Sequence, residues 1–352
     1  MNLGEAQFHR DNHYVPCAYL RGFASPSERL FAYRILVPHA EVPLWKEKSI
    51  RGVGRLSHLY TRIAAGRETD EIERWLDREF EAPAAEALRR ATSDGRLTPD
   101  DWRHLVRFLA AQIVRTPAYF VDKLPGWHTD LPNLLNSTLQ ELVQKLDAAK
   151  RSGEPITVPD APHSDYLNVR VTTEARPGQE TAELKGTMVA GRNLWLFTMR
   201  HLLSGTGAAK LLHEHSWSIL APYKDLTWFT SDDPVIRLNY HAEDRYDFKG
   251  GCGSPGTEIL LPLSPHHLLY TRIGHRAPRR GTVFPRAQTE MIRRFIAEHA
   301  FRMIFAASEE ADVAKLRPRT VNDQLFRNER EKWQSWPAEQ TAAELGLREP
   351  PR

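Results

Sequence analysis

Apolar residues recur at steps of three and four along much of the first half of the chain, a spacing that is typical of amphipathic helices. The first such stripe follows Thr69 and consists of Ile72, Trp75, Leu76, Phe80 and Leu88. Pro83 lies inside this run, and because proline lacks the backbone N–H that a helix interior needs, it predicts a kink or a division. The pattern therefore predicts an interrupted helix that begins at about Thr69.

Two further helices are predicted from the residues at their ends. Thr98 is followed by a proline and an acid at the first and third helical positions, which is a strong signal for a helix start. This helix should end at Thr116, because a residue before proline avoids the helical conformation. A third helix is expected over 133–150. Residues 152–192 are rich in Pro, Gly and Thr, which predicts a loop-bearing insertion or a boundary.

Short apolar runs separated by turn residues predict strands in the second half of the chain. Near the N-terminus, a short helix should end near Gly22, followed by an edge strand over 29–35 and a loop over 38–55. The later expected elements are helices over 195–212, 288–300 and 320–333, and strands over 217–220, 227–230, 234–238, 258–261, 267–270 and 301–306. Residues from 334 onward are expected to form a peripheral tail.

Together these elements predict an α+β protein with a helical N-terminal half and a small, mainly antiparallel sheet in the C-terminal half. We expect a single domain over 1–333, with its helical part at about 60–215 and its sheet-containing part at about 216–307. No internal repeat is visible, which argues against solenoids and propellers.

Composition narrows the class of protein. The 352 residues are 41% hydrophobic and 26% charged, the balance of an ordinary globular protein, and a net charge of +3 is too small to indicate a nucleic-acid binder by bulk charge. Two cysteines argue against a disulfide scaffold or a cysteine zinc site. The chain has neither an apolar leader nor an apolar run of about 18 residues, so we expect a cytoplasmic protein.

Three polar residues fall on the apolar faces of the predicted helices. Glu79 lies on the stripe of the first helix, and Gln112 and Arg115 lie on that of the second. A buried arginine needs an acid, so we expect Arg115 to pair with Glu79 in a buried contact that locks the two helices. The same residues could instead line a polar pocket between the helices.

His13 and the acids of 229–235 are the other candidates for chemistry. His13 precedes a Tyr-Val-Pro turn, a weak similarity to the general-base histidine of HNH nucleases, and the simpler interpretation is that it tethers the N-terminal segment. Asp232 and Asp233 follow a predicted strand. Such a position suits metal-binding or general-base carboxylates, although acids before a proline also stabilise tight turns.

A basic loop in the C-terminal half is the candidate contact for an acidic partner. Arg272, Arg276, Arg279 and Arg280 cluster within nine residues. Such a run is usually a solvated surface loop, but it could bind nucleic acid, and that binding would depend strongly on salt.

Five motifs together resemble one known family. They are NHYVP at 12–16, YLRGFA at 19–24, QIVRTP at 112–117, FTSDDPV at 229–235 and LPLSP at 261–265. Their order and spacing over about 10–307 resemble the bacterial family called domain of unknown function 4238, with a mild departure at Cys17. The resemblance implies a single, mainly helical bacterial domain and no assigned reaction.

Two functional hypotheses remain open at this point. The first is a cytosolic hydrolase or metal-dependent phosphodiesterase or nuclease with a defence or toxin-like role. Its site would comprise His13, Glu79, Gln112, Arg115, Asp232 and Asp233. Glu79 or Asp232 would hold Mg²⁺ or Mn²⁺ or act as base, His13 would carry the proton, and Arg115 would stabilise the anion. The second is a non-catalytic binding or scaffold protein in which the same residues form buried networks.

Overall fold

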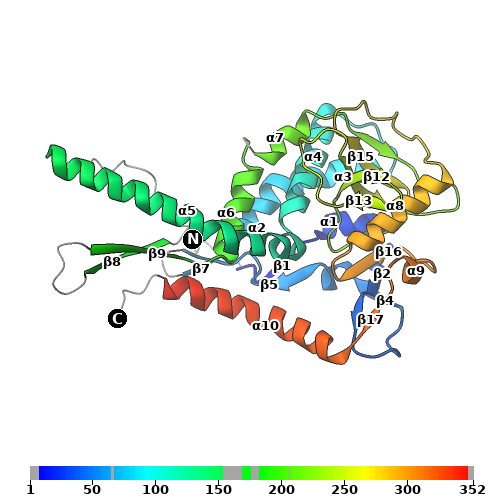
Figure 1. Cartoon of the computed structure of the whole chain (residues 1–352). Helices are drawn as coiled ribbons and strands as arrows, with labels where there is room; N and C mark the ends of the chain where they lie inside the picture. Colours follow the sequence, from blue (N-terminus) through cyan, green and yellow to red (C-terminus); the bar gives the residue numbers. More distant parts are fainter. Residues whose placement is uncertain (1–7, 65–66, 154–168, 176–181, 206, 348–352) are drawn as a thin grey trace, which may run out of the picture.

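The structure is a computed structural model that describes residues 8–64, 67–153, 169–175, 182–205 and 207–347 (Figure 1). Strands occur along the whole described chain, so the fold is mixed α+β and the N-terminal half is not purely helical. One sheet is assembled from both ends of the chain. Its strands, in spatial order, are β11 (Thr230–Ser231), β16 (Met303–Ala306), β2 (Arg29–Arg34) and β4 (Trp45–Ser49), all antiparallel.

This first sheet corrects two expectations about the N-terminal region. β2 lies between two neighbours and is not an edge strand, and the expected loop over 38–55 contains β4. Only Trp45 of β4 is buried, while Lys46 and Glu47 are exposed. Charged side chains are common on edge strands, where they oppose aggregation, so β4 carries little of the hydrophobic signal that predicts a strand.

The second sheet confirms the expected antiparallel arrangement in the C-terminal half. Its order is β10 (Ser218–Leu220), β15 (His267–Arg272), β14 (Glu258–Ser264), β12 (Ile236–Ala242) and β13 (Arg245–Asp247). The other strands of the described residues form four two-stranded sheets: β1 (Asp11–His13) with β5 (Arg55–Ser57), β3 (Leu36–Val37) with β17 (Thr320–Val321), β6 (Arg62–Ala64) with β7 (Arg67–Thr69), and β8 (Val169–Ala175) with β9 (Ala182–Met188).

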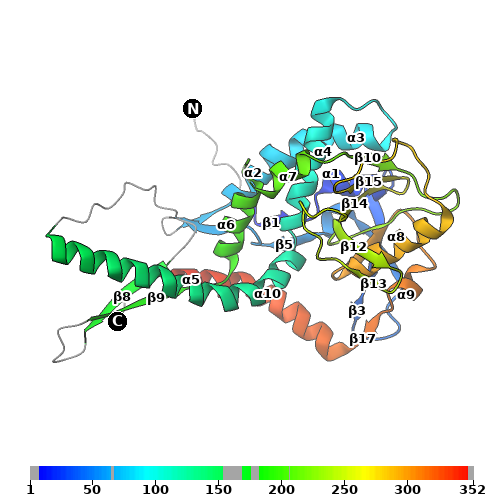
Figure 2. The ribbon, with the colours of Figure 1, turned by 45° about the horizontal axis from the view of Figure 1, so that its top comes forward.

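Helices pack around these sheets (Figure 2). They are α1 (Cys17–Leu20), α2 (Glu71–Leu76), α3 (Ala82–Thr92), α4 (Pro99–Val114), α5 (Pro117–Ser152), α6 (Arg192–Leu203), α7 (Ala208–His213), α8 (Arg286–His299), α9 (Val313–Leu316) and α10 (Asp323–Gly346). The predicted start of α4 is confirmed, because Thr98 and Asp101 form a reciprocal capping box. A π-helical turn over Asp77–Glu81 joins α2 to α3.

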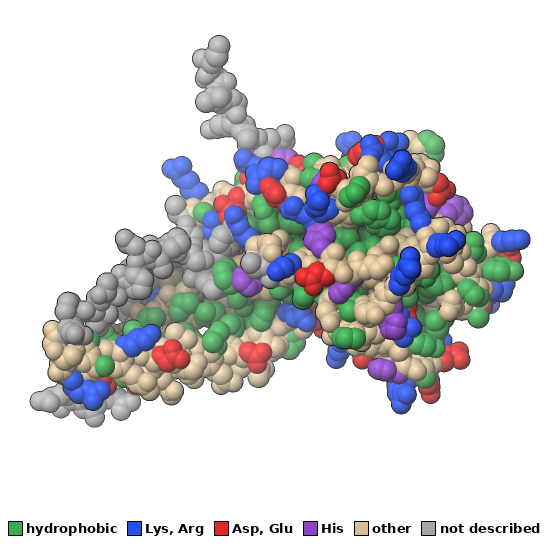
Figure 3. All heavy atoms as spheres, turned by 90° about the horizontal axis from the view of Figure 1, so that it is seen from above, with side chains coloured by type: hydrophobic (Ala, Val, Ile, Leu, Met, Phe, Trp, Pro, Cys, Tyr) green, Lys and Arg blue, Asp and Glu red, His purple; other side chains and the backbone are tan. Residues whose placement is uncertain are grey.

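Helix α5 and the β8–β9 hairpin extend away from the rest of the protein (Figures 1 and 2). The predicted helix over 133–150 is only the distal part of α5, which continues through Pro125 and Pro132. The described part of 152–192 contains the hairpin, where a loop was expected. Some hydrophobic side chains are visible on the surface of this extension (Figure 3). In the distal part of α5, Leu134 is 62% exposed.

Helix α10 continues well beyond the expected end at 333. Residues 334–346 are therefore not a peripheral tail, since Trp336 and Glu344 are buried. Arg192 at the start of α6 is fully buried and donates to both carboxylate oxygens of Glu344, at 3.1 and 2.9 Å. Pro337 lies inside α10, so the local signal that usually ends a helix is overridden by this packing.

Three of the sequence motifs meet in the core. The Tyr19 hydroxyl lies 2.5 Å from the Pro262 carbonyl, to which it donates, and 2.6 Å from Oγ1 of Thr230. Gly22 packs directly on the backbone of Leu263, and a Cβ atom there would overlap the Leu263 carbonyl oxygen. These contacts join the N-terminal motif to both sheets. Motifs that are far apart in sequence therefore lie next to one another in the fold.

Replacing Gly22 by alanine should therefore destabilise the protein. The new methyl group meets backbone, which cannot move aside as a flexible side chain could, so we expect a loss of about 1–3 kcal/mol in the free energy of unfolding. Gly52→Ala is the matched control, because a Cβ at Gly52 meets nothing within 4 Å. Urea unfolding of both variants measures the difference, and equal stabilities would contradict the packing argument.

Candidate functional site

Arg115 lies at the C-terminal end of α4 and is fully buried. Its Nη1 donates to Oε1 of Glu81 at 2.7 Å, and its Nη2 donates to the His13 carbonyl oxygen at 2.6 Å. The guanidinium also lies over the ring of Tyr60, 5.6 Å from its centroid. The expectation of a buried arginine with an acidic partner is confirmed, but the acid is Glu81.

The expected pair of Arg115 with Glu79 is wrong. The Glu79 side chain is 38% exposed and pairs with Arg78 at 3.0 Å and with Arg107 at 3.5 Å. The π-helical turn over Asp77–Glu81 is the physical reason. Such a turn widens the helix, and Glu79 lies inside it, so Glu79 does not follow the 3.6-residue period from which its inward position was predicted.

Glu73 belongs to the same buried cluster and was missed by sequence analysis. Burial raises the pKa of its carboxyl to about 7, against the opposing charge of Arg115. A hydrogen bond from the His13 backbone N–H also acts on this carboxylate and favours its ionised form. The cluster therefore places two carboxylates, Glu73 and Glu81, around one guanidinium.

His13 and Gln112 do not join a common site. His13 is half-buried, its Nε2 lies 3.3 Å from the Arg51 carbonyl oxygen, and burial lowers the pKa of its imidazole. Gln112 is fully buried, and neither polar atom of its side chain has a hydrogen-bond partner among the described residues.

The two adjacent acids, Asp232 and Asp233, point to different surroundings. Asp232 is 1% exposed and accepts hydrogen bonds from the backbone N–H groups of Phe301, at 3.1 Å, and Arg302, at 3.0 Å. Nε of Arg302 lies 3.6 Å from its other oxygen. Burial raises the pKa of the Asp232 carboxyl. These contacts hold the turn that precedes β16 and give Asp232 the position of a structural residue.

Asp233 is the one predicted site residue that lines a large cleft. Its Oδ1 accepts from the Thr116 hydroxyl at 2.9 Å, and its Oδ2 lies 3.2 Å from Nε2 of His299. The same Nε2 lies 3.0 Å from the Val235 carbonyl oxygen. Because both neighbours are acceptors, Nε2 carries a proton, and in the neutral form of the ring the lone pair is therefore on Nδ1.

The cleft has a volume of about 680 Å³ and lies between the start of α5, the strands β12 and β13, and the end of α8. Cationic side chains share it with the Asp233–His299 pair: Lys123, Arg237 and Lys249. Lys123 is paired with Asp122 at 2.8 Å. Within the part of the chain that the structure describes, no carboxylate lies within ion-pair distance of Arg237. Its side-chain hydrogen-bond partner is the Cys252 thiol. The cleft thus combines the Asp233–His299 pair with a guanidinium that has no acidic partner among the described residues.

Tyr119 also lines this cleft, and burial raises the pKa of its phenol to about 12. Sequence analysis missed Tyr119, His299 and Arg237. Arg237 carried a usable signal, since it interrupts the apolar run of a predicted strand. His299 carried none, because a histidine in the last turn of a helix is also favoured by the helix dipole alone.

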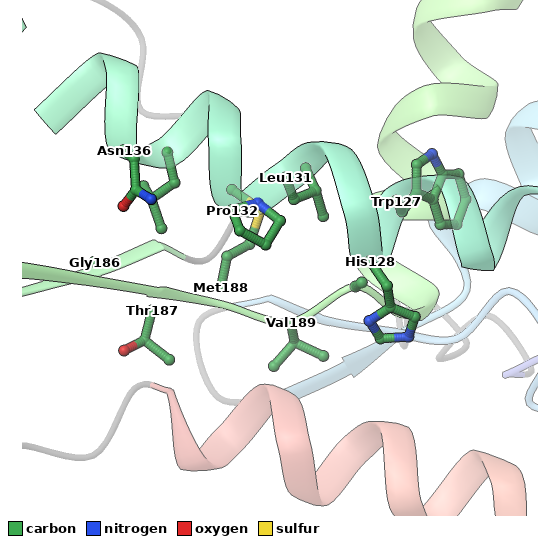
Figure 4. A pocket seen from close by; sticks show the side chains of 11 residues that line it. Trp127, His128, Leu131, Pro132, Asn136, Gly186, Thr187, Met188 and Val189 are labelled. Atoms are coloured by element: carbon green, nitrogen blue, oxygen red, sulfur yellow. The ribbon is translucent and has the colours of Figure 1, made fainter.

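A second cavity, of about 440 Å³, separates α5 from β9 (Figure 4). His128 extends from α5 toward Val189, which directly follows β9, and Trp127, Leu131 and Met188 contribute apolar walls. None of the residues that line this cavity is an acid, a lysine or an arginine. It therefore offers no acid–base pair and no charged anchor.

The basic loop is partly used inside the protein. Arg280 donates to the Gly95 carbonyl oxygen at 2.6 Å, whereas Arg272, Arg276 and Arg279 are exposed. Among the described residues, no three His, Cys, Asp or Glu side chains gather in a way that could hold a metal ion. In the same ranges, no helix combines the length and hydrophobicity that a membrane crossing requires.

Comparison with known proteins confirms the resemblance carried by the five motifs. The model of the family described as "Protein of unknown function (DUF4238)" matches residues 11–310. The chain belongs to the DUF4238 family. No curated protein and no solved structure matches it. In this DUF4238 protein, the motif residues Tyr19, Gly22, Arg115 and Asp232 make buried structural contacts, and Asp233 reaches the cleft.

Proposed function

We propose that this protein is a hydrolase that acts on a phosphate ester or diester in the cleft of Asp233 and His299. The observation that supports it is the hydrogen-bonded Asp233–His299 pair, with side chains 15% and 17% exposed, on the wall of a cleft that also contains Arg237. A histidine oriented by a carboxylate is a common general base, and arginine suits the binding of phosphate.

The proposed reaction uses His299 as a proton carrier. Asp233 and the Val235 carbonyl accept from Nε2–H. In the neutral ring, Nδ1 would then take a proton from water. As the water oxygen bonds to phosphorus, the bond from phosphorus to the leaving oxygen breaks. The leaving oxygen then takes the proton from the imidazolium, which Asp233 stabilises in the interval. Arg237 would bind the non-bridging oxygens and offset their growing charge.

The alternative is a non-catalytic scaffold, and specific contacts favour that role for some residues. Arg115 and Asp232 are sealed from solvent and have partners inside the protein. We therefore propose that these two residues, which were candidates for catalysis, stabilise the fold. Mg²⁺ or Mn²⁺ dependence, nucleic-acid binding by the exposed arginines of the basic loop, and a defence or toxin-like role stay predictions.

The test is hydrolysis of 4-nitrophenyl phosphate and bis(4-nitrophenyl) phosphate, each with and without Mg²⁺ or Mn²⁺. We expect His299→Asn and Asp233→Asn to lower kcat/KM by about 10²–10⁴-fold, the usual contribution of a general base. The matched control is His201→Asn, because His201 also lies in the last turn of a helix, is exposed and does not line the cleft. Wild-type protein inert toward both esters under all conditions, or full activity of His299→Asn, would overturn the proposal.

A further inference from the structure

A separate groove, of about 600 Å³, lies between α10 and the strands β2 and β5. Its walls are made by side chains of α10, by Arg34 of β2, and by Arg302 and Tyr14. It shares no lining residue with the cleft of Asp233 and His299. Its volume lies within the range of about 300–1,000 Å³ that is typical of small-molecule sites.

The lining of this groove carries an excess of positive charge. Two of its four arginines are neutralised by acids that also line it: Arg34 pairs with Glu329 at 2.5 Å, and Arg55 pairs with Asp11 at 2.6 Å. Nε of Arg302 lies 3.6 Å from the carboxylate of Asp232, which is buried behind it. The fourth, Arg330, is exposed.

Arg330 is the cation available to a ligand. Within the described residues, it forms no ion pair. An anion in the groove would therefore bind this side chain without displacing an acid of the protein.

Aromatic rings lie against two of the guanidinium groups, those of Arg302 and Arg34. The Arg302 guanidinium lies over the ring of Trp333, 5.1 Å from its centroid, and donates to the Tyr14 hydroxyl at 3.0 Å. The Arg34 guanidinium lies 4.8 Å over the ring of Phe326. The Arg302 side chain is only 11% exposed, so the surface on which a further aromatic ring can stack is mainly the half-buried ring of Trp333.

We propose that this groove binds a mononucleotide, with the base stacked against the Trp333–Arg302 pair and the phosphate bound by Arg330. Aromatic rings alone would suit any flat apolar ligand, and Arg330 alone would suit any anion. Their presence in one groove of this volume favours a ligand that is flat at one end and anionic at the other. The inference does not depend on the proposed hydrolase activity.

The experiment is isothermal titration calorimetry of the full chain with AMP, GMP, CMP and UMP. For the nucleotide that binds best, we expect its nucleoside and ribose 5-phosphate each to bind at least tenfold more weakly, because each lacks one half of the recognised ligand. Raising the salt concentration should weaken nucleotide binding, since the phosphate contact is electrostatic. No binding of any of the four nucleotides at millimolar concentration would overturn the proposal, as would equal binding of ribose 5-phosphate.

Matched variants on α10 locate the site. Arg330→Ala should lower nucleotide affinity at least tenfold, while Arg327→Ala, on the same helix but outside the groove, should leave it unchanged. Both arginines are exposed, so neither change should affect folding. Trp333→Leu tests the stacking and should weaken binding of the nucleotide more than that of ribose 5-phosphate. Wild-type affinity in Arg330→Ala would place the ligand elsewhere and refute the assignment.

Discussion

Replacing Arg115 by methionine should lower the free energy of unfolding by about 3–5 kcal/mol, the cost of removing one partner from a buried ion pair. The change leaves the carboxylates of Glu81 and Glu73 without their cationic partner and the His13 carbonyl oxygen without its hydrogen-bond donor. Methionine fills much of the same volume, so the loss reflects charge and hydrogen bonding more than a cavity. Denaturant unfolding at neutral pH measures it.

The control for this prediction lies on the same helix. Arg107 pairs with Glu79 at 3.5 Å, and both side chains are more than a third exposed, so Arg107→Met should cost less than about 1 kcal/mol. A double-mutant cycle should show coupling of Arg115→Met with Glu81→Leu and little with Glu79→Leu. Equal costs for the two arginines, or stronger coupling to Glu79, would show that the cluster is wrongly assigned.

Local signals in the sequence predicted the elements whose ends are fixed locally. The start of α4 is an example, since Thr98 and Asp101 satisfy each other's backbone groups within one turn. The apolar stripe also placed Arg115 correctly on a buried face. It could not identify the acidic partner, because one π-helical turn changes which acid faces inward.

Elements whose formation depends on distant parts of the chain could not be predicted in this way. β2 becomes an interior strand only because β16, from residues about 270 positions later, pairs with it. The C-terminal part of α10 is held by Arg192, and the prolines inside α5 and α10 gave a local signal for helix ends that the fold overrides. Tertiary packing outweighs local preference in each case.

In the candidate site, too, one residue had a local signal in the sequence and its partner did not. Asp233 was identifiable because two acids at a strand end form a recognisable pattern. His299 reaches it from a helix more than 60 residues away, and nothing in either segment indicates the other. Most of the motifs that carry the family resemblance make contacts that hold distant segments of the fold together. The contacts of Tyr19 with Pro262 and of Asp232 with Arg302 are examples. A motif can therefore mark where a chain is held together as well as where it reacts.

Glu73→Gln should stabilise the protein at high pH and leave its stability unchanged at low pH. In the folded state, the pKa of this carboxyl is about 7, above its ordinary value of 4.5. Between these two values, the folded chain retains a proton that the unfolded chain has released, so the stability of the wild type falls as pH rises through this window. The total loss is about 3 kcal/mol above pH 7, and below 4.5 the group contributes nothing.

Glutamine has nearly the same shape and no charge, so it removes this penalty while it can still accept from the His13 N–H. Denaturant unfolding at several pH values between 4.5 and 8 measures the free energy of unfolding of both proteins. The variant should become more stable than the wild type as pH rises to about 7, and the difference should then stay constant at up to about 3 kcal/mol. Glu86→Gln is the control, because Glu86 is exposed and paired with Arg89 and Arg90, which lower the pKa of its carboxyl to about 2. Glu86→Gln should be no more stable than the wild type at pH 8. The opposite result is a stability difference between Glu73→Gln and wild type that is the same at every pH. That result would mean that Glu73 is ionised over the whole range and that both carboxylates beside Arg115 are charged.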